Sequence, residues 1–354
     1  MAESRIGQLD FLRGIALFGV LAVHTMQAFP SALSFMDDIY YYGRYGVQLF
    51  FAVSGFTMMM MYRSYMQHWE SPAKVFYIKR IMRLYPLFVV AAFAYWPLQL
   101  APSYFNPDGT QFIDIVRVLT LTGGIDPHLL NAVVPGGWSI VNEIYFYITF
   151  PLIYYLTGRV NPYLFSLAIC LMSYALAGFA DELFAGKENY LVTDFLYRNY
   201  INQLIIFFAG TEAYRQVFNG KSDFLKICLP LIFAGILLEF LSHRAALLDS
   251  VVLAILSYYS LLLVFKFSKF TSQKIQSLGR VTYTGYIIHF GIIDACVWLS
   301  EIFQIRQSLY FEIVIVITTL ITYVVANAIA GVTERYWQHV GNKICEKKLK
   351  VIKP

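Results

Sequence analysis

Charged residues are scarce in this chain of 354 residues. Asp, Glu, Lys and Arg together make up 14% of it, whereas hydrophobic residues make up 58%. Soluble domains average about 25% charged and about 45–50% apolar residues. The composition therefore excludes an ordinary soluble protein, and the length leaves no room for a large soluble domain beside a membrane part. We predict an all-α polytopic membrane protein with a single transmembrane domain over residues 1–354.

Cysteine and the common cofactor motifs are also missing or few. The four cysteines, Cys170, Cys228, Cys296 and Cys345, lie in or beside apolar segments without the spacing of metal ligands. This pattern indicates neither a disulfide framework nor a zinc site. A phosphate-binding loop and the three-glycine dinucleotide fingerprint are absent as well. We therefore expect no metal cofactor and no nucleic-acid partner.

Long apolar runs are what the chain has instead. We predict about ten membrane-spanning helices, each long enough or nearly so to cross the hydrocarbon core. They cover residues 10–28, 45–62, 84–100, 139–157, 162–180, 199–215, 225–242, 248–265, 281–300 and 309–333.

The basic residues between these spans orient the chain. With the N-terminus in the cytoplasm, the inside segments carry about three times as many Lys and Arg residues as the outside segments. The outside residues are Arg44, Arg117, Lys187, Arg198, Arg244 and Arg306. We predict a bacterial-type cytoplasmic (inner) membrane protein with both termini in the cytoplasm. The first span is expected to stay uncleaved, because Arg13 and His24 interrupt the apolar run that a signal peptide needs.

The first span carries ionisable side chains along one face. At 100° per residue, Asp10, Arg13 and His24 fall within about 60° of one another, and about 16 Å separates Arg13 from His24 along the axis. Arg13 alone could be an anchor that reaches the cytoplasmic interface, and His24 alone an interfacial histidine. Ionisable residues inside a membrane more often line a working site. His24 is the side chain best suited to accept a proton near neutral pH.

A basic cluster precedes the third span. Arg80 and Arg83 lie in the segment after the second span, at its cytoplasmic end, and would be i, i+3 neighbours if this segment were helical. Two guanidinium groups can hold phosphates in a bidentate manner. On spacing alone, a cluster that binds anionic lipid headgroups is the simpler interpretation.

The fourth and ninth spans contain further polar groups. Glu143 and His24 are expected at similar depth near the outer side, where a carboxylate could orient the imidazole. Trp138, at the start of the fourth span, could be only an interfacial aromatic. Thr282, Tyr286 and His289 share one face of the ninth span and suggest a polar tunnel lining. Ser54, in the middle of the second span, is a weaker candidate, because Ser-Gly pairs are common where helices pack closely.

Together these motifs resemble the membrane acyltransferase-3 family. The matching segments are Arg13 to His24 with ten residues between them, Gly46 to Phe56, Arg80 to Arg83, Trp138 to Tyr147, and Leu278 to His289. The chain departs from the family pattern at Ile140, where Leu is usual, at Thr282, where Ser is usual, and at Ile144, where a second acid is common. The variant without a C-terminal esterase-like domain is the one that the chain resembles.

The resemblance implies an O-acyltransferase that moves an acetyl group from cytoplasmic acetyl-CoA to a hydroxyl of a surface polysaccharide or glycolipid. It implies His24 as general base with Glu143 and Arg13 in the catalytic group. Arg80, Arg83, Arg13 and Asp10 would bind the donor, and Ser54, Trp138, Thr282, Tyr286 and His289 would line the acceptor tunnel. The lipid bilayer and a glycan acceptor are the expected partners.

A transporter or exporter of glycans or small solutes is the alternative, because a polar stripe inside the membrane also suits a translocation path. The pair Arg80 and Arg83 favours the enzyme, because a carrier does not require it. A purely structural protein would leave the buried stripe unexplained.

The charge distribution predicts the outcome of a topology experiment. Reporter domains fused after residues 120 and 350 should report an outside and a cytoplasmic position, respectively, because basic segments are retained on the cytoplasmic side. A reporter at residue 350 that is active only outside the cytoplasm would contradict the predicted orientation.

Overall fold

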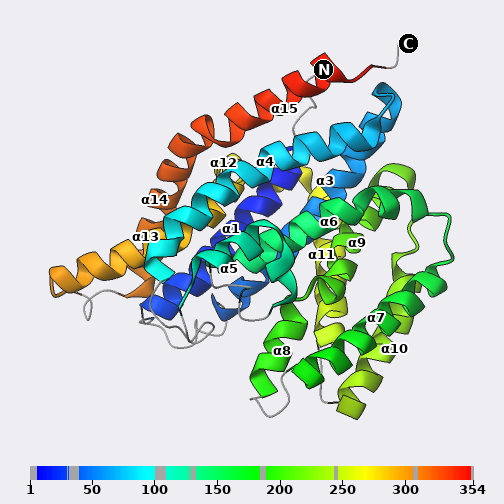
Figure 1. The fold of residues 1–354 in the computed structure, drawn as a ribbon, viewed down its shortest axis with the longest axis horizontal. Helices are drawn as coiled ribbons and strands as arrows, with labels where there is room; N and C mark the ends of the chain where they lie inside the picture. Colours follow the sequence, from blue (N-terminus) through cyan, green and yellow to red (C-terminus); the bar gives the residue numbers. More distant parts are fainter. Residues whose placement is uncertain are drawn as a thin grey trace. The chain divides into compact units, whose positions relative to one another are not determined.

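The computed structural model describes residues 6–29, 31, 40–99, 109–126, 129, 133–183, 189–242, 246–305 and 310–351. Over these residues the protein is helical, with one isolated β-bridge between Trp69 and Val351 and no strand (Figure 1). The all-α prediction is therefore confirmed for the described part of the chain. The long helices are α1 (Gly7–Ala28), α3 (Gly46–His68), α4 (Pro72–Tyr95), α6 (Gly137–Leu156), α7 (Pro162–Leu183), α9 (Tyr200–Asn219), α10 (Phe224–Ser242), α11 (Ala246–Lys266), α13 (Thr282–Ile302), α14 (Phe311–Val332) and α15 (Glu334–Lys348).

Shorter elements connect them. These are η2 (Tyr42–Tyr45), η3 (Trp96–Gln99), α5 (Phe112–Leu119), η4 (Thr122–Ile125), α8 (Asn189–Arg198), η5 (Ser268–Phe270) and α12 (Gln273–Gly279). The α12 helix is followed directly by Arg280 and Val281 and then by α13. This places the end of α12 next to the first turn of a helix that carries several predicted site residues.

Seven helical segments in the described residues are long and apolar enough to cross a membrane. They are Gly7–Ala28, Tyr42–His68, Pro72–Leu98, Pro162–Leu183, Ala246–Lys266, Thr282–Ile302 and Phe311–Lys348. The other predicted spans lie on α6, α9 and α10, which are not among these seven, so the count of about ten is not confirmed. The orientation stays a prediction. Some basic residues used for it lie outside the described residues: Arg5, Lys187, Arg244, Arg306 and Lys353.

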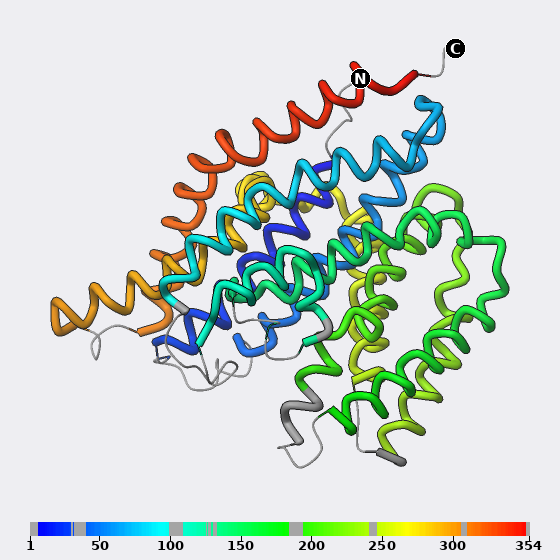
Figure 2. The backbone as a smooth tube through the Cα atoms, viewed as in Figure 1, coloured from blue at the N-terminus to red at the C-terminus, as the bar shows by residue number. Residues whose placement is uncertain are grey.

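The helix of the third predicted span begins before that span. The predicted span starts at residue 84, whereas α4 runs without interruption over Pro72–Tyr95 (Figure 2). Arg80 and Arg83 therefore lie inside a helix and are i, i+3 neighbours on it. The predicted start of the span follows hydropathy, which falls at charged residues. The backbone hydrogen bonds of the helix continue through these residues. Proline in the first turn favours the observed start, because its missing N–H is not needed there.

Contacts divide the chain into two compact units. The first unit consists of residues 1–50, 82–88 and 263–341, and the second consists of residues 51–81, 89–262 and 342–354. That the chain forms one transmembrane domain over residues 1–354 stays a prediction.

In the first unit, α1 packs closely against α12 through two glycines. A Cβ atom on Gly14 would lie 2.2 Å from the carbonyl oxygen of Ile275, and one on Gly279 would lie 1.7 Å from that of Asp10. The backbones touch directly, so no side chain fits between them. Farther along α1, the hydroxyl of Thr25 lies 3.3 Å from that of Thr318 on α14. These contacts fix α1 against the helices that carry the other polar residues of the unit.

The second unit has an aromatic core. The ring of Phe207 on α9 stacks on Phe51 of α3 at 4.4 Å and on Phe146 of α6 at 4.2 Å between centroids. All three rings are buried. A Cβ atom on Gly55 would lie 2.0 Å from the carbonyl oxygen of Phe207, so α3 and α9 also meet backbone to backbone. The stacked rings and this close crossing set the position of Ser54, which precedes Gly55.

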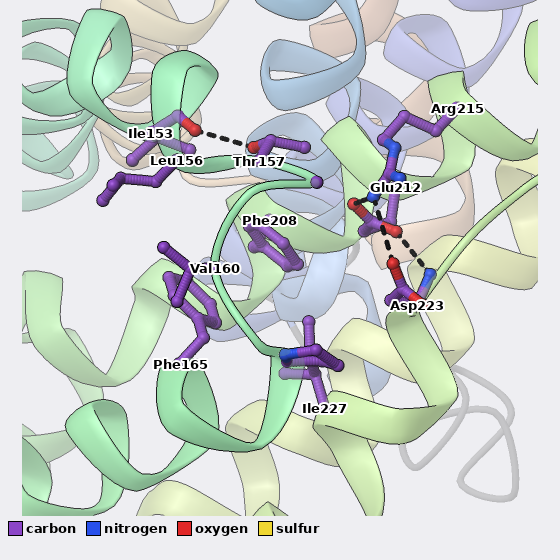
Figure 3. A pocket seen from close by; sticks show the side chains of 12 residues that line it. Ile153, Leu156, Thr157, Val160, Phe165, Phe208, Glu212, Arg215, Asp223 and Ile227 are labelled. Carbon is purple, nitrogen blue, oxygen red and sulfur yellow. Dashed lines mark hydrogen bonds and ion pairs between the residues drawn. The ribbon is translucent and has the colours of Figure 1, made fainter.

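The second unit also contains a small hollow lined by residues of α6, α7, α9 and α10 and of the turns between them (Figure 3). Its wall is mostly apolar. The guanidinium of Arg215 lies 2.7 Å from Glu212, and the backbone N–H of Asp223 donates to Glu212 at 2.8 Å. A hydrogen bond from Lys226 holds the pKa of the Asp223 carboxyl below its ordinary value. Because these charges are paired with one another, we interpret them as contacts that stabilise the turn between α9 and α10.

The close approach of α1 and α12 predicts a position-specific loss of stability. Gly14→Ala should lower the free energy of unfolding by about 1–3 kcal/mol, because the added methyl group overlaps a backbone carbonyl that cannot move aside. Gly178→Ala in α7 is the matched control, because a Cβ atom there meets nothing within 4 Å. Melting of the detergent-solubilised proteins compares them. Equal melting temperatures of Gly14→Ala and the wild type would contradict the close contact.

Candidate active site

A buried ion pair lies near the N-terminal end of α1. Asp10 is 1% exposed, and its Oδ1 lies 3.1 Å from Nη1 of Arg13. Arg280, at the end of α12, approaches the other carboxylate oxygen at 4.0 Å. A buried carboxylate needs such partners, because its charge is costly in a medium of low dielectric constant. The structure thus brings together two residues of the predicted stripe and adds a second arginine to them.

Farther along α1, His24 lies beside a second histidine. The ring centroids of His24 and His289, on α13, are 5.4 Å apart. Phe290 packs against both rings, at 4.4 Å from His24 and 4.2 Å from His289. His289 is fully buried, whereas His24 is half-buried. Of the two imidazoles, His24 is therefore the more exposed.

The predicted polar face of α13 points inward. Thr282, Tyr286 and His289 are all buried. The ring centroid of Tyr286 lies 5.4 Å from that of His289. The ring of Phe50 packs edge-on against Tyr286, with 6.1 Å between their centroids. The hydroxyl of Thr282 donates to the carbonyl oxygen of Gly279 at 2.7 Å and so also holds the end of α12.

In the second unit, Glu143 of α6 is held by two hydroxyl groups. Ser54 of α3 donates to its Oε1 at 2.9 Å, and Tyr147, one turn farther along α6, donates to the same oxygen. Among the described residues, no hydrogen bond involves the second carboxylate oxygen of Glu143. The carboxylate is therefore fixed through one oxygen and available through the other.

Arg80 extends this polar group. It is only 3% exposed, its Nη2 lies 2.9 Å from the sulfur of Met61, and its guanidinium lies 5.9 Å from the ring centroid of Tyr147. The phenol of Tyr147 thus contacts Glu143 with its hydroxyl and Arg80 with its ring. Arg83 belongs to the first unit, where the hydroxyl of Tyr283 on α13 donates to the neighbouring carbonyl oxygen of Leu84 at 2.6 Å.

Trp138 is buried at the start of α6. The edge-on ring of Phe51 lies 5.9 Å from it, and the guanidinium of Arg198 lies over its ring at the same distance. Asn142 ties this end of α6 to α8, because its side-chain N–H donates to the carbonyl oxygen of Arg198 at 2.7 Å. These contacts give Trp138 a packing role besides any contact with substrate.

The predicted site residues thus form separate groups within the two units. Asp10 lies with Arg13, His24 with His289, and Glu143 with Ser54. The predicted contact between His24 and Glu143 joins residues of different units and stays a prediction. In the part of the chain that the structure describes, no group of three or more His, Cys, Asp or Glu side chains could hold a metal ion.

Four residues that contact the predicted site residues were not predicted from the sequence. Tyr147 could have been found, because it follows Glu143 by four residues and helical neighbours at that spacing touch. Arg280 and Phe290 reach their partners from distant parts of the chain, and no local pattern marks such pairs. Gln27 contacts His24 through its side-chain amide at 3.0 Å, and nothing in its sequence context sets it apart from an ordinary polar residue at a helix end.

Comparison with known families assigns the chain. The acyltransferase domain model of the acyltransferase-3 family matches residues 6–327, which include every predicted site residue. The comparisons with curated proteins and with solved structures gave no significant match. Because the family model covers most of the 354 residues, the chain is a member of the acyltransferase-3 family.

Proposed function

We propose that this protein is an integral membrane O-acyltransferase that moves an acetyl group from cytoplasmic acetyl-CoA to a hydroxyl of a surface polysaccharide or glycolipid sugar. The supporting observation is the arrangement along α1. One helix carries a buried pair of Asp10 and Arg13 toward one end and His24, beside His289, toward the other. Such a helix connects an anion-binding region with a proton acceptor over about 16 Å.

In this proposal, basic side chains bind the donor. Arg80 and Arg83 hold the phosphates of the donor, with Arg13 assisting and Asp10 keeping the Arg13 guanidinium in place. Guanidinium groups suit this task, because their planar donors match phosphate oxygens. Arg80 is buried, so its guanidinium would meet the donor inside the protein and not at the surface.

His24 acts as general base in the transfer. Its imidazole takes the proton of the acceptor hydroxyl while the hydroxyl oxygen attacks the thioester carbonyl carbon. The tetrahedral intermediate collapses, the carbon–sulfur bond breaks, and the imidazolium returns its proton to the leaving thiolate. A two-step route in which the imidazole first accepts the acyl group uses the same residues. Acyl label retained on the protein without acceptor would identify this second route.

Further residues shape the site. Glu143 orients the imidazole and stabilises its protonated form, and Ser54, Trp138, Thr282, Tyr286 and His289 line the path of the acceptor. The protein lies in a bacterial-type cytoplasmic membrane with both termini in the cytoplasm, so that the thioester and the hydroxyl arrive from opposite sides.

The assignment of the base predicts the effect of one substitution. His24→Ala should lower acetyl-CoA-dependent release of CoA by roughly 10²–10⁴-fold, because general-base catalysis contributes that much. His339→Ala, at an exposed position of α15, is the control and should keep wild-type activity. Full activity in a correctly inserted His24→Ala protein would reject His24 as the base. A carrier would release no CoA at all.

The assignment of the donor site predicts a loss of binding. Arg80→Ala should weaken acetyl-CoA binding by about tenfold or more, because a hydrogen bond to a charged group contributes about 1.5–3 kcal/mol. Arg159→Ala is the control, because Arg159 is exposed, lies in the turn after α6 and donates to the carbonyl oxygen of Tyr155. Calorimetric titration measures both, after melting without donor has shown that Arg80→Ala is folded. An unchanged dissociation constant would contradict the assignment.

A further inference from the structure

The position of the proton on His24 follows from its neighbour on α1. Gln27 lies one turn farther along the helix, and its Oε1 is 3.0 Å from Nδ1 of His24. An amide oxygen only accepts hydrogen bonds, so Nδ1 of His24 is the donor and carries the proton. The lone pair of the neutral imidazole is then on Nε2. In the proposed reaction, this is the nitrogen that takes the proton of the acceptor hydroxyl.

His289 is in the same tautomeric form for a separate reason. Its Nδ1 lies 2.5 Å from the backbone carbonyl oxygen of Tyr286, which can only accept. Its Nε2 is buried and has no hydrogen-bond partner among the described residues. Both imidazoles thus present a lone pair on Nε2, but a backbone carbonyl fixes the buried ring, whereas a replaceable side chain fixes His24.

We infer that Gln27 is the positioning residue of His24. It keeps the proton on Nδ1 and limits rotation of the ring, so that Nε2 faces the acceptor hydroxyl. This inference rests on the proposed function of His24 as general base. Gln27 then orients the ring, the task that the proposed function gave to Glu143, and Glu143 keeps only the stabilisation of the protonated imidazole. Phe290 supports the same ring orientation by packing against its face.

Two substitutions of Gln27 separate the hydrogen bond from the shape of the side chain. Gln27→Met keeps the length but removes the acceptor, whereas Gln27→Glu keeps an oxygen at the same place. We expect Gln27→Met to lower kcat by about tenfold, the effect of losing one hydrogen bond of ordinary strength, with a KM for acetyl-CoA within about twofold of wild type. Gln27→Glu should keep kcat within about threefold of wild type. Gln67→Met, at an exposed position near the end of α3, is the matched control.

Nitrogen-15 NMR of labelled histidine gives a readout that does not depend on activity. The signals of His24 are identified by their loss in His24→Ala. We expect a protonated Nδ1 in the wild type and in Gln27→Glu, and a mixture of tautomers in Gln27→Met. A wild-type kcat in Gln27→Met, or equal losses in Gln27→Met and Gln27→Glu, would overturn the inference. If His24→Ala stays active, the proposed function fails, whereas the NMR result still tests the contact between Gln27 and His24.

Discussion

The first unit depends on the buried carboxylate of Asp10. A charge at a site that is 1% exposed is stable only with partners nearby. The two partners of Asp10 come from different parts of the chain. Arg13 belongs to α1 itself, and Arg280 follows α12. The ion pairs therefore tie α1 to the junction from which α13 starts. The same junction is held by the direct backbone contact at Gly279, which leaves Asp10 no freedom to turn toward water.

The alignment of the two histidines follows from this junction. Once the start of α13 is fixed against α1, the register of both helices brings His289 next to His24 near the middle of α13. The second unit uses a comparable device. Ser54 and Tyr147 fix one oxygen of Glu143, and the crossing of α3 and α9 at Gly55 fixes Ser54. In both units a close contact between backbones places a polar group that has little freedom of its own.

Helical periodicity was sufficient to find the polar stripe on α1 and the inward face of α13, because both are properties of one helix. Hydropathy located most spans but not their ends. It placed the start of the third span at residue 84, since it treats Lys and Arg as the end of a span, and it did not show that the helix of this span already begins at Pro72. The count of about ten spans is not confirmed, and on α9, one of the three helices outside the seven clear candidates of the described residues, Asn202, Gln203 and Glu212 are buried.

Contacts between residues that lie far apart in the chain could not be predicted from the sequence. Matching the depth of Glu143 and His24 gives their heights in the membrane but not the directions in which they point, so it predicts compatibility rather than contact. Arg280 pairs with a residue near the other end of the chain. Gln27 contacts its own helical neighbour and was within reach of the i, i+3 rule, but that rule does not distinguish a glutamine that orients an imidazole from one that faces solvent.

Burial gives the two histidines different roles. In both rings Nδ1 lies within hydrogen-bond distance of an oxygen that only accepts, Oε1 of Gln27 for His24 and the carbonyl oxygen of Tyr286 for His289. A proton taken up by His289 would create a charge in a fully buried place beside Phe290 and Tyr286, which is costly. His24 is half-buried, so its charged form keeps part of its solvation. An amide at Nδ1 orients this ring without adding a negative charge to an apolar surrounding. The pair is therefore asymmetric, with a half-buried imidazole on α1 beside a fully buried one on α13.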